Sequence, residues 1–186
     1  MIYNIPWDFA APKATLVFDE AGNLYGSTER QGLVFKLTPN PDETWTESDI
    51  ASTKFSPLVA VAGVIADSAG NLYGASPNGG ITKGTGSCNP NVAWFGCGVV
   101  FKLTQHADGT WAVTVLHQFS GPDGVNPIGV LALDGSGALY GTTLLGGGHG
   151  VGAVFQTHTR SQRKLEVHAA LGAGPAFNSP IGRSDS

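Results

Sequence analysis

The order of apolar and polar residues along the chain repeats three times. Each copy starts with a short apolar stretch ending at an aspartate, passes through a glycine turn into the letters LYG, and then reaches an alternating segment, LVFKLT, VVFKLT or AVFQTH. In the first two copies a turn (NPDET or HADGT) leads into a segment that contains Trp45 or Trp111. Alternation with a period of two is typical of half-buried strands. The pattern therefore predicts units of four short strands joined by hairpins.

Repeated four-stranded units predict an all-β fold, a β-propeller-like array of about three four-stranded antiparallel blades. The copies are expected at about residues 14–50, 60–119 and 127–158, within a single repeat domain of residues 1–158. Residues 159–186 show no further turn and no Trp strand, which predicts an irregular C-terminal tail. Known propellers have four or more blades. Three blades would therefore be closed by the termini or by a homodimer, or they would form a fragment with exposed edges; unpaired edges favour closure.

The repeated residues of the first hairpin have local structural explanations. Aspartate accepts backbone hydrogen bonds within turns, and glycine supplies the positive φ that follows, so three aspartates are expected to be turn residues: Asp19, Asp67 and Asp134. Three tyrosines are expected to pack between blades: Tyr25, Tyr73 and Tyr140. The glycine after each tyrosine indicates a close approach of the backbone to a neighbour, or a bend in the strand.

Composition narrows the function classes. Only 13% of the residues are charged, the net charge is −4, and lysine and arginine form no cluster, so we expect no nucleic-acid partner. The longest apolar runs are too short for a membrane span. The first residues, MIYNIPWDFAAPK, lack the basic start and apolar centre of a signal peptide.

The chain has two cysteines, Cys88 and Cys97, which flank the segment NPNVAWFG. A disulfide that closes this loop would favour an oxidising compartment, and hence an extracellular or periplasmic location. Two free thiols fit the same spacing, because spacing alone does not decide connectivity.

Propeller geometry predicts where a site would lie. The loop that enters each blade and the loop between its second and third strands share one face, and loops on a rigid scaffold commonly carry function. Oxygen donors in these loops suit a calcium ion, with Asp123 and Asn126 as the central pair and Glu29 and Asn78 from neighbouring blades. His149 lies among glycines, where an imidazole could move a proton to or from a ligand. The alternatives are an ordinary Asp-Gly turn and solvated loop residues.

The unit D-x-x-G-N-L-Y-G, followed by G-x-V-F-K-L-T, resembles the GloVer-type tandem repeat of bacterial proteins that are often secreted or surface-anchored. The resemblance covers about residues 14–158, and the third copy has Ala138 where asparagine is expected. It implies a propeller-like repeat fold. It implies no reaction, since the repeat has no general activity.

The hairpin D-x-x-G-N-L-Y also resembles the blades of calcium-dependent lactonase propellers. That resemblance implies a hydrolase of small lactones or esters, in which calcium polarises the carbonyl group and helps to activate water. Calcium would then lie among Glu29, Asn78, Asp123 and Asn126, and His149 would be the base. The alternative is a non-catalytic repeat module that binds a ligand or a protein on its surface, because one fold hosts many functions.

Overall fold

The computed structural model describes residues 12, 15–28, 32–52, 62–80, 96–159 and 166–169, and these residues form strands and turns without a helix. The first sheet contains β1 (Val17–Phe18), β2 (Leu24–Ser27), β3 (Leu33–Pro39) and β4 (Trp45–Ser52). The second sheet contains β5 (Val64–Ala66), β6 (Leu72–Ser76), β7 (Val99–Gln105) and β8 (Trp111–Gln118). In both of these sheets the strand pairs are antiparallel and follow chain order, which confirms the predicted blades.

The third sheet differs from the prediction at both ends. It contains β10 (Ala132–Leu133), β11 (Ala138–Leu145), β12 (Ala153–His158) and β13 (Glu166–Ala169), and β9 (Val125–Pro127) pairs with the far end of β11. The prediction of an irregular tail from residue 159 is wrong for β13, which pairs with β12 as the fourth strand of this sheet. The free edge of β12 offers backbone groups to any extended segment, so this strand forms without the Trp signal of the other copies.

The same residue types face each other across the strands of all three sheets. The residue after the repeated tyrosine is glycine, and its partner on the third strand is phenylalanine; the pairs are Gly26 with Phe35, Gly74 with Phe101, and Gly141 with Phe155. A Cβ atom added at Gly74 would lie 2.6 Å from Cζ of Phe101, and one added at either of the other two glycines would overlap its phenylalanine ring. The close approach predicted at these glycines is therefore the packing of a buried phenylalanine ring directly against the glycine backbone.

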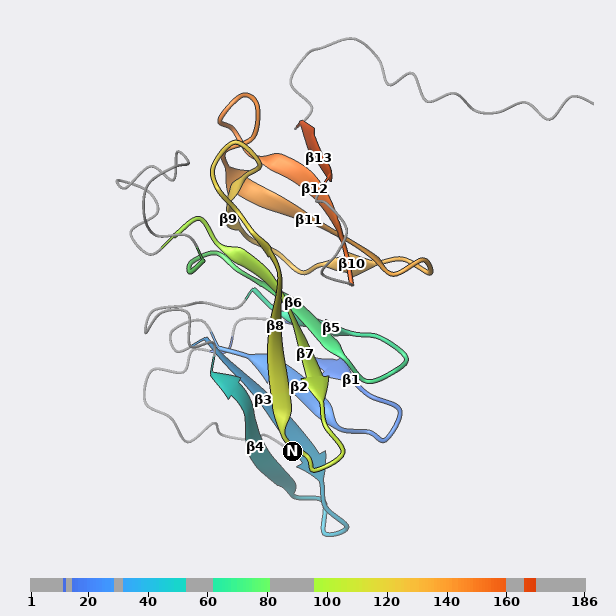
Figure 1. The fold of residues 1–186 in the computed structure, drawn as a ribbon. Helices are drawn as coiled ribbons and strands as arrows, with labels where there is room; N and C mark the ends of the chain where they lie inside the picture. The colour runs from blue at the N-terminus through green and yellow to red at the C-terminus, as the bar shows by residue number, and fades with distance from the viewer. Residues whose placement is uncertain are drawn as a thin grey trace, which may run out of the picture.

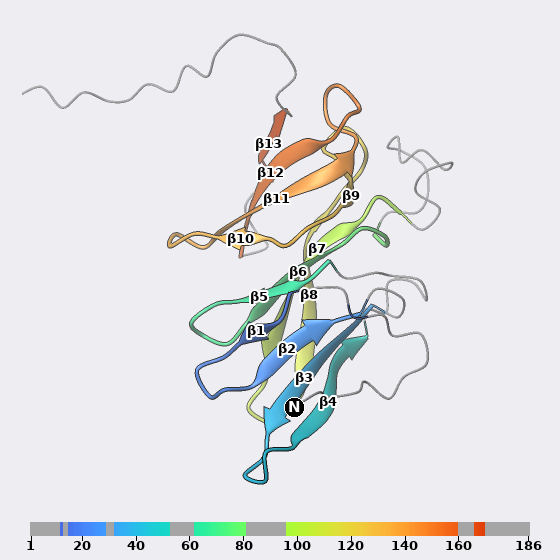
Figure 2. The same ribbon diagram turned by 180° about the vertical axis from the view of Figure 1, so that it is seen from behind.

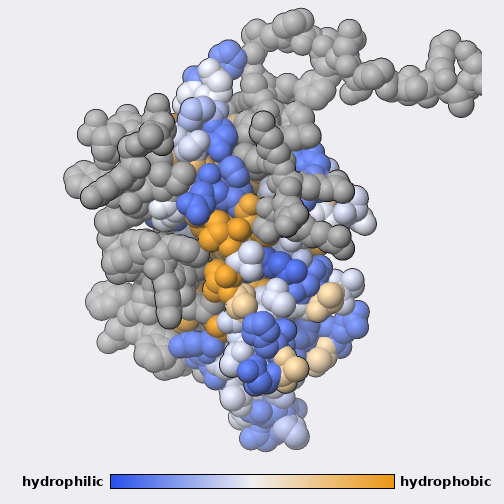
Figure 3. Space-filling view, in the orientation of Figure 1, coloured by the Kyte–Doolittle hydropathy of each residue, from blue (hydrophilic) through white to orange (hydrophobic). Residues whose placement is uncertain are grey.

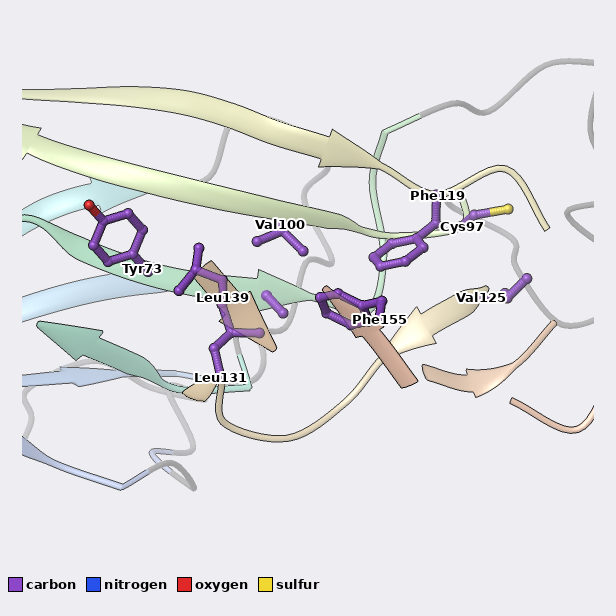
Figure 4. Close-up of a cluster of buried hydrophobic side chains, with 9 residues drawn as sticks. Tyr73, Cys97, Val100, Phe119, Val125, Leu131, Leu139 and Phe155 are labelled. Carbon is purple, nitrogen blue, oxygen red and sulfur yellow. The ribbon is translucent and has the colours of Figure 1, made fainter. Parts of the chain in front are cut away.

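Two apolar clusters join the sheets into one stack. One joins Tyr25 and Val34 of the first sheet to the apolar face of the second, including Val64 and Phe101. The other joins Tyr73 and Val100 of the second sheet to residues of the third; Figure 4 shows the aromatic and aliphatic side chains of this cluster, among them Leu131, Leu139 and Phe155. Tyr25 and Tyr73 are buried between sheets, as predicted for packing residues.

The three sheets follow one another in chain order along the stack, with the first at one end and the third at the other (Figures 1 and 2). Hydrophobic residues are exposed near the middle of the stack in Figure 3, and the surface above and below them is hydrophilic. The described strands do not close into a ring. The sequence prediction of a propeller-like array is confirmed as an open arc of three blades.

Candidate functional site

The repeat places its turns and its longer loops on opposite sides of the stack. The three Asp-x-x-Gly turns, which join β1 to β2, β5 to β6 and β10 to β11, project to one side in Figures 1 and 2. The segments between β8 and β9 and between β11 and β12 lie on the other side. Each side is a candidate surface for function, and the sequence pattern pointed only to the loop side.

The loops of the second and third sheets meet on the predicted face. Nδ2 of Asn126 donates a hydrogen bond to the carbonyl oxygen of Pro77 (2.8 Å), and its backbone N–H donates to the carbonyl oxygen of Cys97 (2.9 Å). The backbone N–H of Gly147 donates to the carbonyl oxygen of Gly121 (3.1 Å). The entering loop of one blade and the loops between second and third strands thus form one connected surface, as expected from the sequence.

Asp123 is held by hydrogen bonds at both carboxylate oxygens. Oδ1 accepts from the backbone N–H (2.8 Å) and the hydroxyl (3.0 Å) of Ser120, and Oδ2 accepts from Nε2 of His117 (2.8 Å). Burial raises the pKa of the Asp123 carboxyl, but the hydrogen bonds from His117 and Ser120 lower it by more, so the net pKa is below its ordinary value. The carboxylate closes the loop onto β8. A calcium ion at Asp123 would have to replace some of these bonds.

The other residues predicted around calcium are in different situations. Asn126 has a positive φ of 54° and uses its amide nitrogen to hold Pro77, next to Asn78. The carbonyl oxygen of Asn78 accepts a hydrogen bond from the Ser76 hydroxyl (2.8 Å). Glu29 lies outside the described residues. Among the residues that are described, no three histidine, cysteine, aspartate or glutamate side chains are grouped so that they could hold a metal ion.

His149 is exposed in the loop between β11 and β12, which places it on the predicted face. Its loop contacts the β8–β9 loop through Gly147 and Gly121, so it belongs to the same surface as Asp123. The sequence did not identify the histidine that contacts Asp123. That residue is His117, whose place in an alternating strand gave no sign of a carboxylate partner.

Cys97 is fully buried beside Phe119 and Val125 in the cluster between the second and third sheets. Cys97 is not a free thiol. Its predicted partner Cys88 lies outside the described residues, so the pairing of the two stays a prediction. A disulfide at this position would tie the long β6–β7 loop to the junction of the two sheets.

On the opposite side, each aspartate turn is a small hydrogen-bond network. Oδ1 of Asp67 accepts from the backbone N–H groups of Ala69 (3.0 Å) and Asn71 (2.9 Å), and Oδ2 accepts from the Tyr73 hydroxyl (2.8 Å). The first turn repeats this arrangement with Asp19 and Tyr25 (2.9 Å), and the third does so with Asp134 and Tyr140 (3.0 Å). The expectation that these aspartates shape turns is confirmed, and the tyrosine hydroxyl is an additional donor that the sequence pattern did not reveal.

These networks keep the aspartates ionised. Burial raises the pKa of Asp19 and Asp67, but the hydrogen bonds from Asn23 and Asn71 and from the tyrosines lower it by more, and both pKa values are below the ordinary one. Backbone and side-chain donors, first the N–H of Ala138, lower the pKa of Asp134 to about 2. Burial and the neighbouring aspartate raise the pKa of Tyr25, so its hydroxyl stays a proton donor.

A hollow of about 380 Å³ lies between the first two turns. The first sheet contributes Val17, Phe18, Asp19, Glu20, Ala21 and Tyr25 to its lining, and the second contributes Ala66, Asp67, Ser68, Gly70 and Leu72. Three carboxylates and several apolar residues thus line one space, and none of the described residues that line it is a lysine or an arginine. The repetition of aspartate and tyrosine was visible in the sequence, but the space between two copies depends on how the sheets pack.

The open array of antiparallel four-stranded sheets defines a β-propeller-like repeat protein. The family model described as the Gloeobacter/Verrucomicrobia repeat matches residues 15–182, and the chain therefore belongs to this family. The match confirms the GloVer-type resemblance and extends past residue 158, where the repeat domain was expected to end. Comparison with curated proteins finds no match, and comparison with solved structures finds none. No helix in the described ranges is long and apolar enough to cross a membrane.

Proposed function

We propose that the protein is a non-catalytic binding module whose ligand occupies the hollow between the first two aspartate turns. The observation that supports this proposal is the combination of three carboxylates with an apolar wall in a space of about 380 Å³. Ligand sites are concave and mostly apolar, with a few polar groups that fix orientation, and this hollow has that composition.

The lining selects a positively charged group on an apolar stem. Asp19 and Asp67 already accept several hydrogen bonds each within their turns, so they contribute negative charge more than free acceptor positions. Glu20 is exposed at the rim and adds a third negative charge. Val17 and Ala66, both half-buried, supply apolar surface for a stem of several methylene groups. A lysine or arginine side chain of a protein segment has this chemistry.

Calorimetric titration of the full chain with N-acetyl-arginine amide and with hexylamine tests this proposal. We expect saturable binding in the millimolar range, which corresponds to about 4 kcal/mol of binding free energy. Replacing Glu20 with glutamine should weaken binding by about twofold to fivefold, the effect of one exposed charge pair. Replacing Ser68 with lysine should abolish it, because the new ammonium group would fill the hollow.

Asp49→Asn is the matched control, since Asp49 is an exposed carboxylate on β4 that does not line the hollow. It should leave both affinities unchanged. Equal loss of affinity in Asp49→Asn and Glu20→Gln would show attraction to the net charge of the protein and would contradict a specific site. A binding heat that does not saturate when either ligand is titrated into the wild-type chain would also contradict the proposal.

A second candidate is the calcium-dependent hydrolase of small lactones or esters. The observation that favours it is the junction of loops on the other side of the stack, where Asn126 contacts the Asn78 loop and the His149 loop contacts the Asp123 loop. Asn78, Asp123 and Asn126, with Glu29, would supply oxygen ligands to calcium, which would polarise the substrate carbonyl group. His149 would act as the base. An extracellular or periplasmic location stays a prediction in either case.

For this candidate we expect turnover of a lactone and ester panel that requires calcium and disappears after chelation. Removing one oxygen ligand by Asp123→Ala should abolish the turnover, while Asp108→Ala, in an exposed turn between β7 and β8, should not. A melting scan separates loss of calcium from loss of folding in these variants, because a ligand that binds only the folded state raises the melting temperature. An inactive wild-type chain across the panel would contradict the hydrolase and leave the binding module unaffected.

A further inference from the structure

The internal packing of the stack shows which face of a sheet covers which. The face that each sheet turns toward the next contains the valine that directly precedes the repeated phenylalanine. In the first two sheets this residue is fully buried, at 0% exposure for both Val34 and Val100. In the third sheet the equivalent residue, Val154, is 43% exposed. The last sheet therefore has a face of the same kind on which none of the described strands lies.

The opposite face shows the same contrast at the other end of the stack. Three residues before each aspartate, Val64 of the second sheet and Leu131 of the third are 0% and 5% exposed, because the preceding sheet covers them. The equivalent residue of the first sheet, Leu16, is 49% exposed, and Phe18 beside it is 64% exposed. Other apolar residues of the first sheet, on β3, are already buried, so the uncovered part of its outer face is the strand β1 and the residue before it.

The uncovered face of the third sheet is the larger of the two. Most of the exposed large apolar side chains in the described part of the chain belong to this sheet and its loops: Ile128, Val130, Leu144, Val151 and Val154. Exposed apolar side chains gathered on one sheet and its loops are typical of an interaction site. The third sheet thus presents a face that inside the stack is covered by another sheet. At β1, with Leu16 and Phe18, the first sheet presents part of the face that inside the stack is covered in return.

We propose that a second copy of this chain covers these faces, with the third sheet of each copy packed against the first sheet of the other. The contact is heterologous, and two copies related by a two-fold axis form it twice, which closes the arc into a ring. Val154 of one copy would take the position that Val34 and Val100 have inside the chain, and Leu16 of the other would take that of Val64 and Leu131. The inference does not rest on the proposed ligand site.

Sedimentation equilibrium of the full chain tests the proposal. We expect a mass twice the 19.2 kDa of one chain. Val154→Lys and Leu16→Lys should each raise the dimer dissociation constant by at least about a hundredfold, because each buries an unpaired ammonium group at both contacts. Val113→Lys, an equally drastic change at an exposed position of the middle sheet, should leave the dimer intact. Circular dichroism melts of all three variants identify any that fail to fold.

The pair of variants distinguishes this arrangement from others. If Val154→Lys dissociates the dimer and a folded Leu16→Lys variant does not, the contact is a symmetric one between two third sheets. This result would overturn the proposal. A wild-type chain that stays at 19.2 kDa up to about 100 μM would overturn it as well. Masses that grow beyond two copies would show a head-to-tail contact that does not close, and would reject the ring.

Discussion

Replacing Phe155 with alanine is expected to lower the free energy of unfolding by about 3–5 kcal/mol, the usual cost of truncating a buried phenylalanine. Phe155 is fully buried, lies over Gly141, and makes an edge-to-face contact with Phe119 at a centroid distance of 5.0 Å. The glycine has no side chain that could move into the vacated space, so the cavity persists. Urea titration followed by far-UV circular dichroism measures the change, at one fixed protein concentration.

Val113→Ala is the control for this prediction, because Val113 lies on an outer strand of the middle sheet and is exposed. We expect its effect to stay within about 0.5 kcal/mol, as for most surface substitutions. If Phe155→Ala changes stability as little as Val113→Ala does, the third sheet does not pack on the second through this ring, and the described core is wrong there.

The second large effect is expected at Gly98, where the loops of the second and third sheets meet. Its φ is +100°, and an added Cβ atom would overlap Cδ of Pro127 and lie 2.7 Å from the carbonyl oxygen of Ser76. Gly98→Ala therefore combines about 1–2 kcal/mol of backbone strain with about 1–3 kcal/mol of overpacking against groups that cannot rotate away. We expect a total loss of about 2–5 kcal/mol in the same urea titration.

Gly109→Ala isolates the backbone contribution. Gly109 has a φ of +85° in the turn between β7 and β8, and an added Cβ atom would meet no atom within 4 Å. It should lose only the strain component, about 1–2 kcal/mol. Equal losses in the two variants would mean that the β9 segment does not lie against Gly98, which would remove the connection between the two loops.

The turns were predictable from the sequence because their contacts are local. Asp67 binds backbone groups two and four residues away and a hydroxyl six residues away, so the letters D-x-x-G-N-L-Y contain nearly the whole network. The strands that follow were predictable for the same kind of reason, since alternation is a property of adjacent residues. The hydrogen bond from the tyrosine hydroxyl to the aspartate was not predictable in the same way, because a tyrosine ring that packs between sheets does not require a particular partner for its hydroxyl.

The candidate sites were harder to predict, because their residues come from different sheets. Asp123 was a candidate calcium ligand from its spacing to Asn126, but its oxygens are taken by Ser120 and by His117 on the preceding strand. That contact depends on how the loop folds back onto β8. The hollow between Asp19 and Asp67 similarly depends on the distance between two sheets, about which neither copy of the motif carries information.

The sequence by itself determined the repeat, the antiparallel blades, the aspartate turns and the close approach or bend at the glycine after each tyrosine, because these features arise from contacts within one unit. Only the tertiary structure decided which faces of the sheets are covered, which carboxylates remain near open space, and that β13 completes the third sheet. The physical reason is that identical residue types, such as Val34 and Val154, receive opposite environments when one has a neighbouring sheet and the other does not.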